Sequence, residues 1–172
     1  MSNKEYSLPE PRFVKLESFH VVGIEGKSSM KNNRIPQYWE TFLPREKEVT
    51  SIVKPGTNYG FCFVEEEAET EMNDDTEFTV LIGDAVSDFS NIPNGMVYRK
   101  IPAAEYAVFT HKGKFFPDGL PRSYGYIYSK WFPNSQYKAD SSFNFEYYEH
   151  GRFKGVDVDD TEIDIYVPLI KE

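Results

Sequence analysis

One glutamate in this sequence stands inside a run of aromatic residues, in the segment Phe145-Glu146-Tyr147-Tyr148. A carboxylate withdrawn from water has a raised pKa, and its burial costs free energy unless a cation or a hydrogen-bond donor lies nearby. Such a group can hold an organic cation, or it can take a proton from water as a general base. Aromatic side chains would add cation–π contacts of about 0.5–2 kcal/mol each. The candidate ligand-binding residues are Glu146, Tyr148, Trp131, Tyr106, Tyr38, Phe63 and Tyr166.

Glu146 stands out because the chain contains an internal repeat. The tetrapeptide Asp-Asp-Thr-Glu at 74–77 recurs 85 residues later, at 159–162. At this offset Glu146 is equivalent to Phe61, so one half carries an acid where the other carries an apolar ring. We therefore predict a tandem duplication. The predicted organisation is a single domain, 1–172, built of two pseudo-repeats at 12–86 and 97–171 with a linker at 87–96.

Each half has the pattern of a strand, a helix and two further strands. Asn33 and Asp118 are expected to be the N-caps of the two helices, and Pro44 and Pro133 to mark their ends. Two such units side by side predict an α+β fold, an antiparallel sheet with helices on one face and a ligand groove at the seam between the units. The predicted strands are 13–26, 59–65 and 78–82 in the first half, and 97–111, 143–149 and 163–167 in the second.

Several of these residues have a simpler alternative interpretation. Glu146 could be a solvated carboxylate, since one face of an antiparallel sheet can be open to water. Trp39 and Tyr124 lie at helical spacing with other apolar residues and are expected to belong to the core. Trp131, which stands just before a proline, fits the core and the wall of the seam equally well.

The composition excludes several classes of protein. Apolar residues make up 40% of the chain and aromatic residues 16%, which excludes intrinsic disorder. The 28 acidic residues outnumber the 19 basic ones, and the net charge of −9 argues against direct binding to nucleic acid or to an anionic membrane. The single cysteine, Cys62, excludes an internal disulfide and a multi-cysteine zinc site. We expect no metal and no cofactor, and a cytoplasmic location, because no signal peptide or membrane span is evident.

The order of several motifs resembles the GyrI-like small-molecule-binding family, which includes the effector-binding domains of AraC- and MerR-type transcription regulators. The motifs are Tyr106-Ala107-Val108-Phe109-x-His111-x-Gly113, Trp131-Phe132-Pro133-Asn134-Ser135, Phe145-Glu146-x-Tyr148 and the segment 162–168. The resemblance implies a site between the two units that recognises lipophilic, often cationic, compounds. It also implies that Glu146 is the recognition carboxylate and that Trp131 and Tyr106 line the pocket.

Three functions follow from these observations. The first is a stand-alone binding domain for hydrophobic, cationic or polycyclic compounds, used in sensing, sequestration or drug tolerance. The second, suggested by relatives in the family, is a hydrolase of cyclopropane-bearing alkylating agents, with Glu146 as general base and Tyr148 or Tyr106 polarising the substrate. The third is an interaction module that docks a separate regulator or another basic protein partner on the acidic run 65–71.

Overall fold

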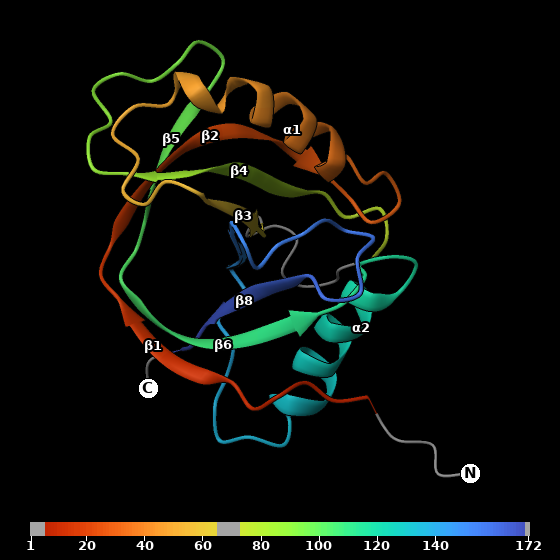
Figure 1. Ribbon diagram of the computed structural model, residues 1–172. Helices are drawn as coiled ribbons and strands as arrows, with labels where there is room; N and C mark the ends of the chain where they lie inside the picture. The colour runs from red at the N-terminus through yellow and green to blue at the C-terminus, as the bar shows by residue number, and fades with distance from the viewer. Residues whose placement is uncertain (1–5, 65–72, 171–172) are drawn as a thin grey trace.

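The computed structural model describes residues 6–64 and 73–170 (Figure 1). They form one eight-stranded antiparallel sheet in the order β1-β6-β8-β7-β3-β4-β2-β5. The sheet curls strongly, and two helices lie on its outer face (Figure 1). The predicted α+β class is therefore confirmed. The strands are β1 (Arg12–Leu16), β2 (Phe19–Ser28), β3 (Thr57–Phe63), β4 (Phe78–Val86), β5 (Val97–Ile101), β6 (Ala104–Lys112), β7 (Phe143–Glu149) and β8 (Glu162–Pro168).

Each long strand predicted at the start of a half is two strands in the structure. The segment 13–26 is divided between β1 and β2, and 97–111 is divided between β5 and β6. Pro102 lies at the second break, where a missing N–H group interrupts the ladder. As a result β1 pairs with β6 of the second half, whereas β5 pairs with β2 of the first. If β1 to β4 are exchanged with β5 to β8 in turn, the strand order read from the opposite edge of the sheet is unchanged. This symmetry supports the proposed duplication.

The two helices begin close to the predicted positions but end differently. Helix α1 (Ile35–Phe42) has Arg34 as its N-cap, whereas Asn33 accepts a hydrogen bond from the backbone N–H of Ile35 at 3.0 Å. Pro44 does not stop the chain from turning, because a 3₁₀ segment (Leu43–Glu48) follows directly and proline loses no hydrogen bond in its first turn. Helix α2 (Gly119–Tyr126) begins after Asp118, as predicted, and continues into one π-helical turn (Ile127–Trp131).

The two faces of the sheet have separate cores. The outer face packs against the helices, with Ile163 and Ile165 under α2 and Val80 and Ile82 under α1. The inner face of the curled sheet is aromatic, and its rings include Tyr59, Phe61, Phe63, Tyr106, Phe143, Phe145 and Tyr166. Nowhere in 6–64 or 73–170 is there a helix long and apolar enough to cross a membrane.

The direction of the side chains corrects the equivalence between the halves in β3 and β7. Phe61 lies on the inner face with its strand partner Phe145, at a ring separation of 4.8 Å. Glu146 points to the opposite, outer face, where it contacts α2. Side chains alternate along a strand, so residues on opposite faces cannot be equivalent. An offset of 84 matches the faces in this strand, and it makes Cys62 the counterpart of Glu146. The equivalence of Glu146 with Phe61 was wrong by one residue.

Candidate functional site

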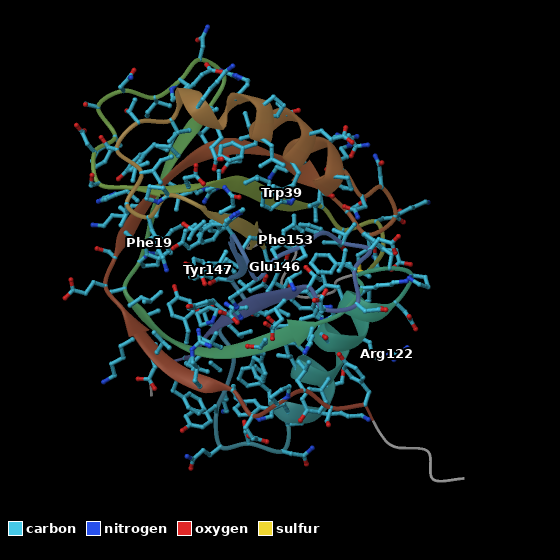
Figure 2. The ribbon with its side chains drawn as sticks, viewed as in Figure 1. Phe19, Trp39, Arg122, Glu146, Tyr147 and Phe153 are labelled. Carbon is cyan, nitrogen blue, oxygen red and sulfur yellow. The ribbon has the colours of Figure 1, made fainter. Side chains whose placement is uncertain are left out.

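Glu146 lies at the centre of the sheet, where the two halves meet. It stands on β7, with Gly60 of β3 on one side and Ile165 of β8 on the other. Its side chain points to the outer face, between the two helices. Figure 2 labels it in the middle of the molecule, together with Trp39 of α1 and with Phe153. We call the outer-face region around Glu146, between α1 and α2, the seam.

Two tyrosine hydroxyls hold the Glu146 carboxylate. Tyr124 of α2 donates a hydrogen bond to Oε2, and Tyr148 of β7 donates one to Oε1 at 2.5 Å. Burial raises the pKa of Glu146, and the two hydrogen bonds only partly oppose this shift. Burial, followed by the nearby negative charge of Glu146, also raises the pKa of both tyrosines. The carboxylate is therefore a desolvated acceptor between two neutral phenol donors rather than a solvated group on an open sheet.

Aromatic rings frame the carboxylate on the side of α1. The ring of Trp39 meets that of Tyr148 edge-on at 4.9 Å, and Phe153 meets the other side of Tyr148 at 4.9 Å. Gly60 has no side chain to fill the space beside Glu146. A Cβ atom placed there would meet Ile82, Trp39 and Tyr148 at 3.6–3.7 Å. The seam therefore has aromatic walls, an acid on its floor and a glycine beside that acid.

Further polar groups continue along the same face. Asn144 donates a hydrogen bond to the Tyr128 hydroxyl at 3.2 Å, and Cys62 lies opposite Asn144 on β3. Burial raises the pKa of the Cys62 thiol to about 12, so it is protonated and unreactive at neutral pH. No group of three or more metal-binding side chains occurs in the described ranges.

The structure brings together only some of the predicted site residues. Glu146 and Tyr148 share the seam. Tyr38 faces the other way on α1, where its hydroxyl donates to the Lys27 carbonyl at 2.5 Å. Trp131 lies at the far end of the second helix, where its indole N–H donates to Glu10 at 3.3 Å. Neither ring has a contact with Glu146.

The other three predicted residues lie on the inner face, behind the sheet. Tyr106 is fully buried, Phe63 stacks on Phe61 at 5.5 Å, and Tyr166 stacks on Phe145 at 4.6 Å. They cannot contact a ligand bound at Glu146, because the sheet backbone separates the two faces. We therefore leave Tyr106, Phe63 and Tyr166 out of the proposed seam site.

Two side chains of the seam, Trp39 and Tyr124, were expected to belong to the core. Helical spacing identifies the face of a helix that packs on the sheet. It does not identify the side chains of the strand that this face contacts. A signal for both was nevertheless present, because Trp39 and Tyr124 are equivalent at the offset of 85 residues. Each helix thus contributes one aromatic residue to the seam from the same position.

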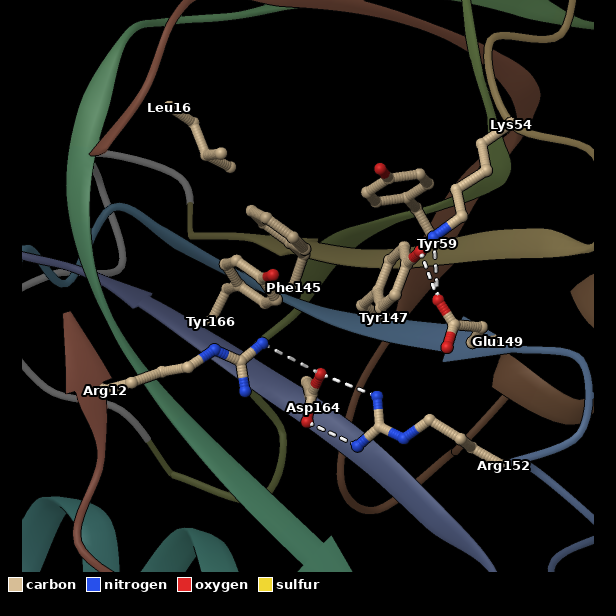
Figure 3. A pocket seen from close by; sticks show the side chains of 10 residues that line it. All are labelled: Arg12, Leu16, Lys54, Tyr59, Phe145, Tyr147, Glu149, Arg152, Asp164 and Tyr166. Carbon is tan, nitrogen blue, oxygen red and sulfur yellow. Dashed lines mark hydrogen bonds and ion pairs between the residues drawn. The ribbon is translucent and has the colours of Figure 1, made fainter. Parts of the chain in front are cut away.

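Two hollows of the surface lie elsewhere. One, of about 390 Å³, opens on the inner face and is lined by residues such as Arg12, Tyr147 and Asp164 (Figure 3). The other, of about 750 Å³, runs between the N-terminal segment and the second helix and includes Tyr6 and Trp131. Neither contains Glu146, which is covered by its two tyrosine partners.

Comparison with known proteins gives matches over nearly the whole chain. The transcriptional regulator BrlR of Pseudomonas aeruginosa is 34% identical over 158 residues, which cover 92% of this chain and 54% of BrlR. The chain thus spans about half the length of this curated relative. SAV2435 bound to tetraphenylphosphonium superposes with a TM-score of 0.71 at 16% identity, with 94% of each chain covered. The EcmrR C-terminal domain superposes with a TM-score of 0.69 at 18% identity, covering 95% of this chain and 98% of that one.

The sequence identity to these two structures is below 25%, so the superpositions show a shared fold. Membership of the family follows from a family model, described as Cass2, integron-associated effector binding protein, which matches residues 12–169. The match confirms the resemblance drawn from the motifs. The chain belongs to the Cass2 family of integron-associated effector binding proteins.

Proposed function

We propose that this protein binds small lipophilic cations in the seam, with Glu146 as the counter-charge. The observation that carries the proposal is a half-buried carboxylate whose hydrogen-bond partners in the described part of the chain are two neutral hydroxyls. Burial raises the pKa of Glu146 more than the two hydrogen bonds lower it, so their compensation of a negative charge there would be incomplete. A bound cation would supply the missing compensation, and the charge of Glu146 would favour cations over neutral compounds of the same shape.

The walls of the seam suit a ligand that carries its charge within an apolar body. Trp39 and Tyr148 present aromatic surface, and cation–π contacts with such rings contribute about 0.5–2 kcal/mol each. Tyr124 covers Glu146 from a helix of only eight residues. A ligand that reaches the carboxylate has to replace the Tyr124 hydroxyl as its partner. The tetraphenylphosphonium bound by SAV2435 is a lipophilic cation of this kind, which supports the proposal.

The test is a titration with tetraphenylphosphonium, followed by the fluorescence of Trp39 in a Trp131→Phe background. Glu146→Gln keeps the size of the side chain and removes its charge, so we expect at least about a tenfold loss of affinity. Glu149→Gln is the matched control, because Glu149 lies three residues along the same strand and on its other face. Equal affinity in wild type and Glu146→Gln would exclude the seam as the cation site.

The pH dependence gives a second readout of the same site. Cation binding needs the ionised carboxylate, and burial raises the pKa of Glu146. As the pH falls, affinity should therefore decrease at a higher pH than for an ordinary glutamate, and it should be independent of this group in Glu146→Gln. An affinity that stays constant down to the pKa of an ordinary glutamate would contradict the assignment.

A second candidate function is hydrolysis of a strained cyclopropane. The favouring observation is a carboxyl with a raised pKa next to two phenol donors, which suits a general base paired with acids. Glu146 would take a proton from water as the water oxygen attacks a ring carbon, and the opening ring would receive a proton from a phenol. Product formation that is lost in Glu146→Gln while binding persists would support this function. Binding without turnover would oppose it.

The structure adds nothing to the protein-docking hypothesis, because the acidic run 65–71 lies outside the described residues.

A further inference from the structure

The hollow on the inner face is separate from the seam. It lies behind β7, on the side of the sheet opposite to Glu146, and its volume of about 390 Å³ is in the range of small-molecule sites. Phe145, Tyr147 and Glu149 line it, whereas the intervening Glu146 and Tyr148 face the seam. Alternation along one strand thus places the side chains of the hollow and those of the seam on opposite faces of the sheet.

Aromatic rings form the walls of this inner hollow. Phe145 and Tyr166 stack at 4.6 Å with an angle of 13° between their planes. Tyr147 meets Tyr59 edge-on at 5.3 Å. Figure 3 shows these four rings around the same space. Flat apolar surfaces at this spacing favour a planar aromatic ligand over a branched aliphatic one.

The charges around the inner hollow are more positive than the protein as a whole. Asp164 is only 1% exposed and is bound by two guanidinium groups, by Arg152 at 2.8 and 2.9 Å and by Arg12 at 3.2 Å. Lys54 pairs with Glu149 at 2.9 Å. Three cations therefore face two carboxylates, and the surplus positive charge belongs to the two arginines. This surplus is unusual on a chain whose net charge is −9.

Neutral hydroxyls also line the hollow, and that of Tyr147 donates to Glu149 at 3.1 Å. Burial raises the pKa of Tyr59, Tyr147 and Tyr166, so all three hydroxyls are protonated at neutral pH. A phenol O–H and a guanidinium N–H are the groups that bind a carboxylate, and a half-exposed guanidinium such as Arg12 can reorient towards one. The hollow thus combines donors and positive charge at its rim with flat rings at its wall.

We infer that the inner hollow is a second binding site, which takes a small planar aromatic carboxylate. The ring system would lie against Phe145 and Tyr166, and the carboxylate would face Arg12, with Arg152 behind it. The site is the electrostatic opposite of the seam. It does not depend on the proposed cation site, because no residue is shared between them.

The probe for this site is 2-naphthoate, titrated by calorimetry into the full chain. We expect binding of one equivalent, and at least about a tenfold loss of affinity in Arg12→Gln, because a charge-assisted hydrogen bond is removed. Arg122→Gln is the matched control. Arg122 is 51% exposed and makes one ion pair with an aspartate, whereas Arg12 is 55% exposed and makes one with Asp164. Figure 2 shows Arg122 on the outer side of α2, away from the hollow.

Leu16→Trp provides a second variant that keeps the charges and fills the hollow from β1. It should abolish binding of 2-naphthoate and leave binding of tetraphenylphosphonium unchanged. Glu146→Gln should do the reverse, so that each proposal can fail alone. Failure of 2-naphthoate to bind wild type, or equal binding to Arg12→Gln and Arg122→Gln, would overturn the inference. Equal binding of naphthylmethylammonium, which has the same ring and the opposite charge, would also overturn it.

Discussion

Glu146 lies where burial disfavours a negative charge and where two tyrosine hydroxyls are its hydrogen-bond partners. Hydrogen bonds from neutral donors stabilise a carboxylate less than a cation does, and burial therefore dominates the shift of its pKa. The protein carries this cost in its unliganded state. Under the proposed function, a cation that enters the seam would remove part of this cost, and this would add to its affinity.

A second buried acid, Asp84, lies on β4 and has a different environment. The side-chain amide of Asn58 donates to Asp84 at 2.7 Å and to Glu46 at 2.5 Å. Burial, and then the interaction with Glu46, raises the pKa of Asp84 to about 8. Asp84 is fully buried. The neutral side-chain amide of Asn58 lies between the carboxyl groups of Asp84 and Glu46. With a pKa of about 8, the Asp84 carboxyl carries a proton at neutral pH.

This proton makes the stability of the protein depend on pH. In the unfolded chain the pKa of Asp84 is near 3.8, whereas in the folded chain it is about 8, so the contribution of Asp84 to stability falls as the pH rises through this interval. Asp84→Asn cannot ionise. We expect its stability relative to wild type to increase between about pH 4 and about pH 8, measured by urea unfolding at several pH values. A difference in stability between Asp84→Asn and wild type that stays constant with pH would contradict the assignment.

At the scale of elements, the seam is built by equivalent parts of the two halves. Trp39 of α1 and Tyr124 of α2 occupy the same position in the two helices and approach the centre of the sheet from both sides. The strands beneath them differ, because β3 offers Gly60 and Cys62 where β7 offers Asn144 and Glu146. The two helices therefore contribute equivalent aromatic residues to the seam, whereas only the second half contributes an acid.

Two glycines of the sheet should respond differently to the addition of a methyl group. Gly60 has ordinary contact distances for a Cβ atom, so Gly60→Ala should cost less than about 1 kcal/mol and Gly60→Leu should fill the seam and block cation binding. A Cβ atom on Gly23 would overlap the Ile82 carbonyl oxygen of the paired strand. Gly23→Ala should therefore destabilise the fold by about 2 kcal/mol or more.

Urea unfolding of the two alanine variants, with tetraphenylphosphonium titration of Gly60→Leu, measures these effects. Unimpaired cation binding by a folded Gly60→Leu would show that the ligand does not use the space beside Glu146.

At the scale of the whole molecule, the net charge of −9 should favour the approach of cationic ligands over that of anionic ones. A negative protein attracts cations over a distance set by the ionic strength, with a screening length of about 10 Å at 0.1 M salt. The association rate of tetraphenylphosphonium should therefore fall as salt is added, while its dissociation rate changes less. Stopped-flow fluorescence at low and high salt measures both rates, and an association rate independent of salt would exclude this steering.

The inner hollow shows why net charge alone does not describe the ligands of this protein. Arg12 and Arg152 come from opposite ends of the sequence, and Asp164 draws them together. The curl of the sheet brings the edge strand β1 next to β6, which places Arg12 beside β8. A local positive surface thus forms on an acidic molecule through the topology of its sheet.

Much of the fold could be predicted because its signals are local. The antiparallel α+β class, the helix starts near Asn33 and Asp118, and the four strands that close the two halves follow from periodicity and from capping residues within each segment. Glu146 could also be singled out from the sequence, since an acid within an aromatic strand is conspicuous in any register. The division of the long first strands was not visible, because it depends on which partner each piece finds across the sheet.

What the sequence alone determined is the fold class, the two helices with the strands that close each half, the family and the unusual acid. What only the tertiary structure decided is which side chains meet that acid. Trp39 and Tyr124 reach the seam, whereas Tyr106, Phe63 and Tyr166 lie behind the sheet. The physical reason is that alternation assigns faces only when the register between strands is known. A shift of one residue moves a side chain to the opposite face, and that register is set by pairing between distant segments.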